Sequence, residues 1–493
     1  MSLAEHLPAL QVVVPLLAAP VCVLLRPRPA WALATGASFA AFGISIGLLF
    51  QVLEVGTISY ALGSWAPPWG IEYRVDLLNA FIALIVTGTA AVVLPYARSS
   101  VDFEIARERQ HLFYCMMLLC LAGLLGMAIT GDAFNVFVFL EISSLATYTL
   151  VAMGRHRKAL MSAFQYLVMG TIGATFFLIG VGLMYMMTGT LNMADLAERL
   201  PALKDTRPIE AAYAFVAVGI ALKLALFPLH LWLPNAYTYA PSAVTAFLAA
   251  TATKVAIYVL LRFTFTVFGV EFAFGEEPLG LLLFIPALLA VFAGSIVACF
   301  QEYGKRLLAY SSVAQIGYIV LALALANVDG LTAALAHIFN HAITKGALFL
   351  ALGCVFFRLG STRIDRMAGL GAEMPWTMAA FVIGGLSLIG VPLTAGFVSK
   401  WLLLEAAFGR GMWWLAALLV LSSLIAVVYV WRVIEAAYFR DPPEGRAPIA
   451  EAPLPLLLPT WLLTLATIYF GLHTTLPVAV ARLAAVRLLG SMP

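Results

Sequence analysis

Long hydrophobic runs alternate with short polar connections along almost the whole chain. Because a helix needs about 20 apolar residues to cross a bilayer, this pattern predicts about fourteen membrane-spanning helices. They are expected near residues 8–25, 31–53, 75–95, 112–130, 133–153, 164–187, 210–238, 241–267, 278–300, 306–326, 329–357, 378–407, 411–437 and 454–475. The chain is therefore expected to be an all-α integral membrane protein, with residues 1–493 forming a single membrane domain.

Composition agrees with this interpretation. Hydrophobic residues make up 63% of the chain and charged residues only 11%, whereas soluble proteins are about 25% charged. The formal net charge is +3, and no basic patch with interleaved aromatic residues suggests nucleic-acid binding. The N-terminal segment lacks a basic start and a small-residue cleavage site, so it is expected to be the first span rather than a signal peptide.

Basic residues gather in alternate connections, after the odd-numbered spans. They are Arg26, Arg28, Arg98, Arg107, Arg109, Arg155, Arg157, Lys158, Lys305, Arg306, Arg358, Arg363, Arg366, Arg440 and Arg446. The positive-inside rule places such connections in the cytoplasm. The protein is therefore expected in the cell membrane, with both termini on the outer side.

Two predicted helices are interrupted by proline, the seventh within residues 223–234 and the twelfth within residues 390–400. Proline breaks the helical hydrogen bonding, and such breaks occur at membrane depth only where protein or water satisfies the backbone. The breaks lie five spans apart, which favours two inverted five-helix repeats, in residues 112–267 and 278–437. Three N-terminal helices (1–111) and a fourteenth helix with a short tail (454–493) would flank them. The alternative is two unrelated proline kinks.

Within the predicted spans, seven ionisable side chains stand out because the stretches around them otherwise read as lipid-buried helix. They are Glu141, Lys223, Lys254, His337, His341, Lys345 and Lys400. A charge at the bilayer centre costs roughly 2.5–3.5 kcal/mol on insertion scales, so such residues are functional candidates by default. This mixture of acid, amine and imidazole predicts a path for protons through the membrane.

Glu141 has no charged neighbour in sequence, and Lys223, just before the first helix break, is its expected partner from another helix. The distance between them would then control the proton affinity of the lysine. A static buried ion pair is the alternative. Lys254 lies about 20 Å along its helix, too deep to snorkel easily, and is a candidate for a lysine that is neutral for part of a cycle.

His337, His341 and Lys345 recur every four residues, which places them on one helical face about 6 Å apart along the axis. Histidine titrates near neutral pH. A single histidine would be interpreted as a core residue, but this series favours proton transfer along a helix. Lys400 follows the second break as Lys223 adjoins the first.

Two further residues are candidates of second rank. His230 lies between two prolines and is expected to cap the broken seventh helix, and Asp132 is expected to cap the fifth. The five cysteines lie in apolar segments without the C-x-x-C spacing of metal sites, and no P-loop or dinucleotide fingerprint is present. We therefore expect no cofactor, no metal and no redox chemistry in the chain itself, which is typical of a transporter subunit rather than an enzyme.

Four stretches resemble the antiporter-like subunits shared by Mrp-type sodium/proton antiporters, respiratory complex I and membrane-bound hydrogenases. They are Thr130–Asn135 leading to Glu141, Lys223–Pro234, Ala309–Tyr318 and His337–Lys345. Residues 188–194, residues 396–400 and the chain length most resemble the D-type subunits of the Mrp antiporters. The long lateral C-terminal helix of one complex I subunit is not expected, because about 20 residues follow the last span.

The resemblance implies fourteen helices with two inverted five-helix repeats, and it implies a role for each site residue. Glu141 and Lys223 would form a modulating pair, Lys254 a central relay, His337 to Lys345 a link between the halves, and Lys400 the terminal site. Other members carry glutamate at the position of Lys400, so the polarity of the last step does not carry over. Partner subunits in a larger membrane complex are also implied.

Three hypotheses follow. The first is a proton-translocating subunit of a sodium/proton antiporter, with protons and possibly Na⁺ as the transported ions. The second is the proton-pumping arm of a redox complex, either an NADH:quinone oxidoreductase or a membrane-bound hydrogenase. The third is a scaffold that does not conduct, although buried charges argue against it because apolar packing would serve a scaffold better.

Overall fold

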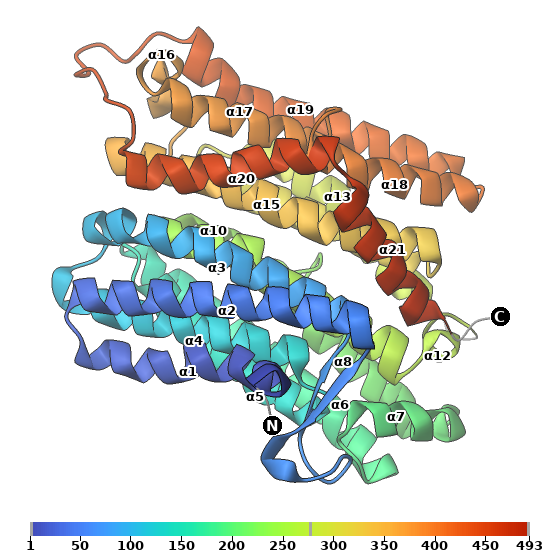
Figure 1. The fold of residues 1–493 in the computed structure, drawn as a ribbon. Coiled ribbons are helices and arrows are strands. Elements are labelled where there is room, and N and C mark those ends of the chain that lie inside the picture. Colours follow the sequence, from blue (N-terminus) through green and yellow to red (C-terminus); the bar gives the residue numbers. More distant parts are fainter. Residues whose placement is uncertain (1–2, 276–278, 491–493) are drawn as a thin grey trace.

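The computed structural model describes residues 3–275 and 279–490. Within them the chain folds into long helices that run side by side as a bundle (Figure 1). The main helices are α1 (Leu7–Leu24), α2 (Pro27–Val55), α3 (Leu77–Glu104), α4 (Gln110–Ile129), α5 (Ala133–Ala152), α6 (Lys158–Thr188), α8 (Arg207–Leu224), α9 (Trp232–Tyr239), α10 (Ser242–Ala250), α11 (Ala252–Leu261), α13 (Leu279–Cys299), α14 (Gly304–Ala324), α15 (Val328–Leu359), α17 (Pro375–Ile389), α18 (Ala395–Gly409), α19 (Trp413–Phe439), α20 (Leu454–Leu472) and α21 (Thr475–Leu489).

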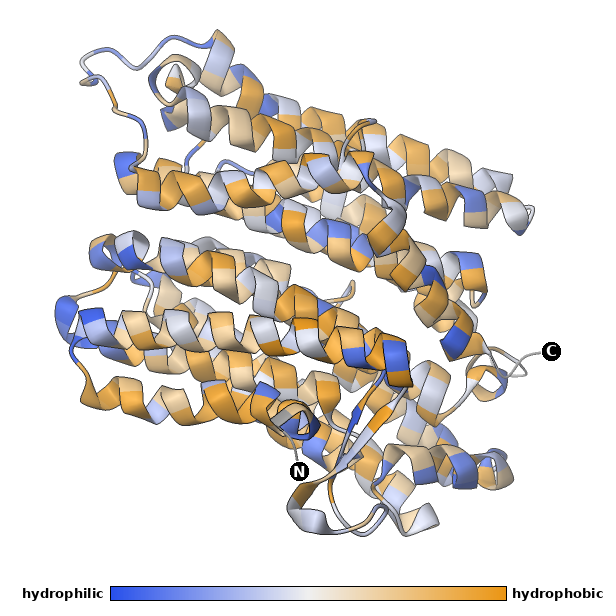
Figure 2. Ribbon diagram, in the orientation of Figure 1, coloured by the Kyte–Doolittle hydropathy of each residue, from blue (hydrophilic) through white to orange (hydrophobic). Residues whose placement is uncertain are grey.

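Among the described residues, twelve helices are long and apolar enough to cross a membrane. Hydrophobic residues cover their length, and hydrophilic residues gather mainly at the two ends of the bundle (Figure 2). The protein is therefore an all-helical, multi-pass membrane protein. The second predicted repeat begins at residue 278, which lies outside the described residues, and α13 begins at Leu279.

Both proline-containing segments interrupt their helices. Helix α8 ends at Leu224, Ala225 adopts a left-handed conformation with φ of 60°, and α9 begins only at Trp232. Helix α17 ends at Ile389, and α18 begins at Ala395. Each break leaves carbonyl groups at a helix end without helical partners, so neighbouring side chains can bind there.

A third interruption was not expected from the sequence. The predicted eighth span divides at Thr251, where φ is −125° and ψ is −58°, into α10 and α11. It then passes into a π-helical turn, η5 (Arg262–Val267). No proline or glycine marks this site, which explains why the sequence pattern did not predict it.

A small β-hairpin lies in the connection before α3, at the end of the bundle near α7 (Met193–Arg199) (Figure 1). Strands β1 (Ile58–Ala61) and β2 (Glu72–Val75) pair antiparallel. The Glu72 carboxylate accepts hydrogen bonds from Ser59 across the hairpin at 2.6 Å and from Asn192, at the start of α7, at 2.9 Å. The remaining short helices are α12 (Val270–Phe274) and α16 (Leu370–Glu373).

Two expectations about the ends of spans need correction. Lys305, expected in a cytoplasmic loop, lies in the first turn of α14 and is only 3% exposed, because its amino group binds Ala240 O and Ser242 Oγ at 3.2 and 3.1 Å. The segment after the fourteenth predicted span is a helix, α21, rather than a plain tail. It packs against α15 and α3 through a buried face that includes Ala481 and Ala485.

Helix α15 lies at the centre of the second half, packed against α10, α14, α17, α18, α20 and α21. Nearly all of its residues from Gly330 to Val355 are buried. A helix enclosed in this way has almost no lipid-facing side, so its polar residues can find partners on neighbouring helices.

Candidate functional site

The basic side chains identified within the spans come from helices α8, α11, α15 and α18, which are linked by packing contacts through the bundle. Lys223 comes from α8, Lys254 from α11, three residues from α15, and Lys400 from α18. Helix α8 packs on α11, α10 packs on both α11 and α15, and α15 packs on α18. Lys254, His337, His341, Lys345 and Lys400 are all 8% exposed or less. The fold therefore places the partly buried Lys223 and these five buried residues on helices that are linked by packing contacts, and we call the six residues the row.

Glu141 and Lys223 do not form an ion pair in this structure. The Lys223 amino group donates instead to Ser144 Oγ at 2.7 Å and to the Tyr148 hydroxyl at 3.3 Å. Both acceptors lie on α5, the helix that carries Glu141, and Ser144 is one turn beyond it. Glu141 Oε1 is buried and has no hydrogen-bond partner among the described residues. The predicted partners therefore lie near one another but are separated.

Lys254 is held by the break that the sequence did not predict. Its amino group donates to Ala249 O, in the last turn of α10, and lies 3.4 Å from Thr253 Oγ1. A helix end leaves its last carbonyls unpaired and carries partial negative charge, which suits a cationic side chain. The break at Thr251 thus provides the binding place for Lys254.

His337 joins three helices. Its Nδ1 lies 2.8 Å from Ser399 Oγ on α18, and its Nε2 lies 2.9 Å from Gln315 Oε1 on α14. Because Gln315 Oε1 can only accept, Nε2 is the donor in that hydrogen bond. Both ring nitrogens therefore have polar partners on neighbouring helices.

His341 is the opposite case. Its ring lies 5.9 Å from that of His337 in a stacked arrangement, yet neither ring nitrogen has a hydrogen-bond partner among the described residues. Lys345, one turn further on, donates to Leu308 O at 2.8 Å and to Ser311 Oγ. Buried polar groups are rarely left unpaired in folded proteins, and ordered water is a common partner. His341 thus differs from His337 and Lys345, which have polar partners on neighbouring helices.

Lys400 folds back onto the break in its own segment. It donates to Leu388 O at 3.1 Å and Ile389 O at 3.0 Å, the last carbonyls of α17, and to Ser423 Oγ at 3.1 Å. A cavity of about 250 Å³ adjoins it, lined in part by Phe397 and Trp401. Lys400 thus shares a cavity wall with Trp401, which is 50% exposed.

The two candidates of second rank lie outside this row. Asp132 caps α5 by accepting a hydrogen bond from Asn135 N at 2.7 Å. His230 lies in the break between α8 and α9, where its ring stacks on Phe227 at 5.3 Å. Asp132 therefore caps its helix as expected, whereas His230 does not cap α9, whose N-cap residue is Leu231.

Two polar clusters were not predicted from the sequence. In one, Glu104 accepts hydrogen bonds from Ser242 N at 3.1 and 3.0 Å, and Ser242 Oγ in turn binds Lys305. In the other, Arg262 is paired with Asp76. Residue spacing was the sequence signal that could have revealed the Arg262 cluster, because Arg262 lies eight residues beyond Lys254, on the same helical face.

Residues 130–426 match the protein family described as NADH:quinone oxidoreductase/Mrp antiporter, TM. The chain is 42% identical to the N-type subunit of the NADH-quinone oxidoreductase of Desulforudis audaxviator, over 95% of this chain and 96% of that protein. It is 33% identical to the D-type subunit of the Na⁺/H⁺ antiporter of Alkalihalophilus pseudofirmus, over 87% and 85% respectively. The expected resemblance to the D-type Mrp subunits is therefore accompanied by a higher identity to a complex I subunit.

The fold is also similar to a chain in the structure of the Mrp complex from Dietzia sp. DQ12-45-1b. The TM-score is 0.91 at 27% identity, and the match covers 100% of this chain and 98% of that one. That chain is therefore part of a complex, as the description of its structure states.

Proposed function

Because this chain belongs to the NADH:quinone oxidoreductase/Mrp antiporter family, we propose that it moves protons as one subunit of a monovalent cation/proton antiporter. Na⁺ is the proposed counter-ion, and the proposed partners are other membrane subunits of the same complex. The observation that carries the proposal is the buried row from Lys223 through Lys254, His341 and Lys345 to Lys400.

The lysines of the row lack the carboxylate partners that a structural network of ion pairs would have, among the described residues. Among the described residues, no carboxylate forms an ion pair with Lys223, Lys254, Lys345 or Lys400. Their amino groups bind helix-end carbonyls and hydroxyl groups instead. An amine held by neutral acceptors can release its proton without leaving a buried carboxylate unpaired. We assign these lysines as relay sites, linked by water and the two histidines.

The proposed architecture contains fourteen membrane spans. The twelve long helices are joined by two interrupted ones, α8 with α9 and α17 with α18. The two breaks lie five spans apart and each has a lysine near it in sequence, Lys223 or Lys400, which supports two inverted five-helix repeats. The distribution of basic loops supports an orientation with both termini on the outer face of the membrane.

In the proposed mechanism, the distance between Glu141 and Lys223 sets when the first lysine binds its proton. In the separated state Lys223 binds Ser144 and Tyr148. Movement of Lys223 by about one helical turn, roughly 5 Å, would bring it to Glu141 and stabilise the ammonium form. Return to Ser144 would release the proton towards Lys254.

The experiment is a comparison of everted membrane vesicles that contain the whole expressed complex, either wild type or Glu141→Ala. Sodium is added to vesicles with an imposed pH gradient, and the collapse of the gradient is followed. We expect the variant complex to assemble normally and to lose the sodium response. A response at the wild-type rate would contradict the proposed role of the pair.

A second function is supported by one specific observation, the 42% identity to a subunit of NADH-quinone oxidoreductase. In that case the proton path would be the same, but electron transfer in partner subunits would drive it. Purification of the complex from native membranes separates the two. Co-purifying flavin or iron–sulfur subunits would favour the redox complex, and small membrane subunits alone would favour the antiporter. A non-conducting scaffold would be indicated only if neutralising the row left transport intact.

A further inference from the structure

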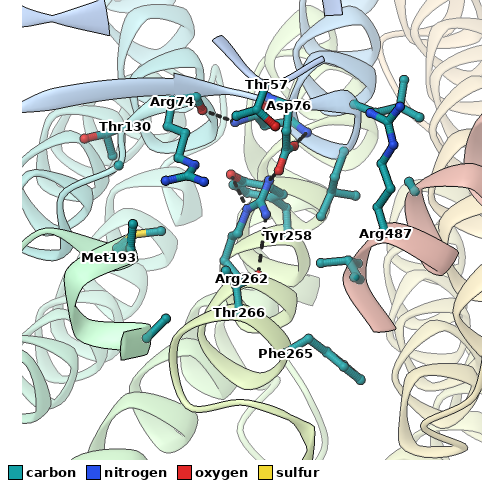
Figure 3. A pocket seen from close by; sticks show the side chains of 18 of the residues that line it. Thr57, Arg74, Asp76, Thr130, Met193, Tyr258, Arg262, Phe265, Thr266 and Arg487 are labelled. Carbon is teal, nitrogen blue, oxygen red and sulfur yellow. Dashed lines mark hydrogen bonds and ion pairs between the residues drawn. The ribbon is translucent and has the colours of Figure 1, made fainter. Parts of the chain in front are cut away.

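A polar cavity of about 510 Å³ opens at the end of the bundle that carries the β-hairpin (Figure 3). Its lining comes from segments far apart in the sequence, including Asp76 before α3, Thr130 after α4, Met193 on α7 and Arg487 on α21. The proposed site makes no use of this cavity. Its size and polar lining suit a group of water molecules.

One helical face connects the cavity to Lys254. Tyr258 and Arg262 follow Lys254 at intervals of four residues, so the three side chains lie on one face of α11 and its continuation. From Lys254 to Arg262 the helix rises by about 12 Å. Tyr258 and Arg262 both line the cavity, whereas Lys254 lies deeper, at 1% exposed.

Three of the side chains that line the cavity, those of Asp76, Arg262 and Tyr258, form a cluster (Figure 3). The Arg262 guanidinium is paired with the Asp76 carboxylate, and its Nε donates to the Tyr258 hydroxyl at 3.1 Å. The Tyr258 hydroxyl donates in turn to Ala128 O at 2.7 Å. The Arg262 guanidinium thus lies in the cavity wall, about two helical turns beyond Lys254, where its positive charge repels an approaching proton.

Asp76 and Arg262 each have further contacts close to them in sequence. Their ion pair can therefore break without unfolding the helices that carry them. Asp76 also caps α3, because its Oδ1 accepts from Asn79 N at 3.1 Å while Asp76 N donates to Asn79 Oδ1 at 2.7 Å. Arg262 begins the π-helical turn η5, where the hydrogen bonding of α11 changes. Its Nη1 also lies 3.5 Å from Thr266 Oγ1, one turn further along.

We propose that Asp76, Arg262 and Tyr258 form the gate through which Lys254 exchanges protons with the hairpin-side cavity. With Asp76 and Arg262 paired, the gate is closed. When they separate, water reaches the Tyr258 hydroxyl, and a proton leaves the Lys254 ammonium through that hydroxyl and water to the cavity, so that Lys254 becomes the amine. This inference rests on the proposed function and adds the route between the row and one membrane face.

The gate predicts opposite effects on proton movement for substitutions of Arg262 and of Asp76. Arg262→Gln removes the repelling charge and leaves a carboxylate that can carry protons, so vesicles with the whole complex should lose an imposed pH gradient several-fold faster without sodium. Asp76→Asn keeps the helix cap and the positive guanidinium but removes the carboxylate that can carry a proton into the cavity, so sodium-driven exchange should slow several-fold without a leak. Arg487→Gln is the matched control, because Arg487 lines the same cavity but does not bind Asp76. It should behave as wild type.

A structural tether would give a different result. If the pair only tethered the helices, Arg262→Gln and Asp76→Asn would lower the amount of assembled complex to a similar extent. The complex that did assemble would exchange at the wild-type rate without a leak, and that result would overturn the gate. Tyr258→Phe provides an independent check if Arg262→Gln does not assemble, since loss of the hydroxyl should slow exchange several-fold. Unchanged exchange in Tyr258→Phe would also overturn the gate.

Lys254→Ala separates failure of the gate from failure of the proposed function. If Lys254→Ala abolishes exchange while Arg262→Gln and Tyr258→Phe behave as wild type, only the gate is wrong. If Lys254→Ala itself exchanges at the wild-type rate, the proton row is wrong, and the gate with it. If the leak of Arg262→Gln disappears when Lys254→Ala is added to the same chain, the gate and the proposed proton row are both supported.

Discussion

Lys400 donates a hydrogen bond of 3.0 Å to the carbonyl of Ile389, across the break that separates their two helices. The lysine therefore occupies the end of α17, where the unpaired carbonyls concentrate negative partial charge. Its amino group also lies 4.7 Å from the centre of the Tyr318 ring, and that ring lies 5.9 Å from His337. Helix break, lysine, tyrosine and histidine thus form one connected unit at the end of the row.

Replacing this lysine should separate transport from stability. Lys400→Met keeps much of the apolar stem but leaves two buried carbonyls without a donor, which costs about 1–3 kcal/mol. It also removes a proton carrier, so we expect exchange to fall by about 10²-fold or more. Thermal unfolding of the purified complex and vesicle exchange measure the two effects. Trp401→Phe, at the neighbouring position on the cavity, is the control and should retain exchange.

The two histidines of α15 should respond differently to the same substitution. His337→Phe breaks hydrogen bonds to Ser399 and Gln315, each worth about 0.5–1.5 kcal/mol, so the complex should be less stable. His341→Phe breaks no hydrogen bond to the described residues and should leave the unfolding temperature nearly unchanged. Both variants should exchange poorly. Normal exchange by His341→Phe would remove that residue from the path.

Close backbone contact maintains the break before Lys400. A Cβ atom at Gly396 would lie 1.9 Å from Ser387 O, whereas a Cβ at Gly409, at the other end of α18, would meet nothing within 4 Å. We therefore expect Gly396→Ala to destabilise the complex by about 1–3 kcal/mol and to displace Lys400 from its carbonyl partners. Gly409→Ala should be silent. Thermal unfolding of both variants, measured side by side, provides the test.

The Asp76–Arg262 pair should stabilise the protein in a pH-dependent way. Burial raises the pKa of Asp76, but the charge and hydrogen bond of Arg262 outweigh it and hold that pKa below its usual value. The stabilisation is therefore present above the unfolded-state pKa of about 3.9 and is lost as pH falls through the lower folded-state value. Relative to wild type, Asp76→Asn should be destabilised at neutral pH, with the difference shrinking in acid. A difference in unfolding temperature that is constant across this range would contradict the assignment.

Many local features of the fold could be predicted from the sequence because their signals are local. Hydropathy predicted the helical spans, and the prolines at 228 and 392 predicted the two breaks. A spacing of four residues placed His337, His341 and Lys345 on one face of α15. The break at Thr251 had no such signal, since neither proline nor glycine occurs there, and it depends on the packing around α10 and α11.

The sequence by itself placed Lys223, Lys254, Lys400 and the three basic residues of α15 within membrane helices, because apolar length and helical period need only neighbours along the chain. Only the tertiary structure decided what each base contacts. It separated Lys223 from Glu141, gave Lys254 a helix end to bind, and buried Lys305. It also joined Asp76 to Arg262 across 186 positions. Such partners are chosen by how distant helices pack, and a one-dimensional pattern carries no signal for that choice.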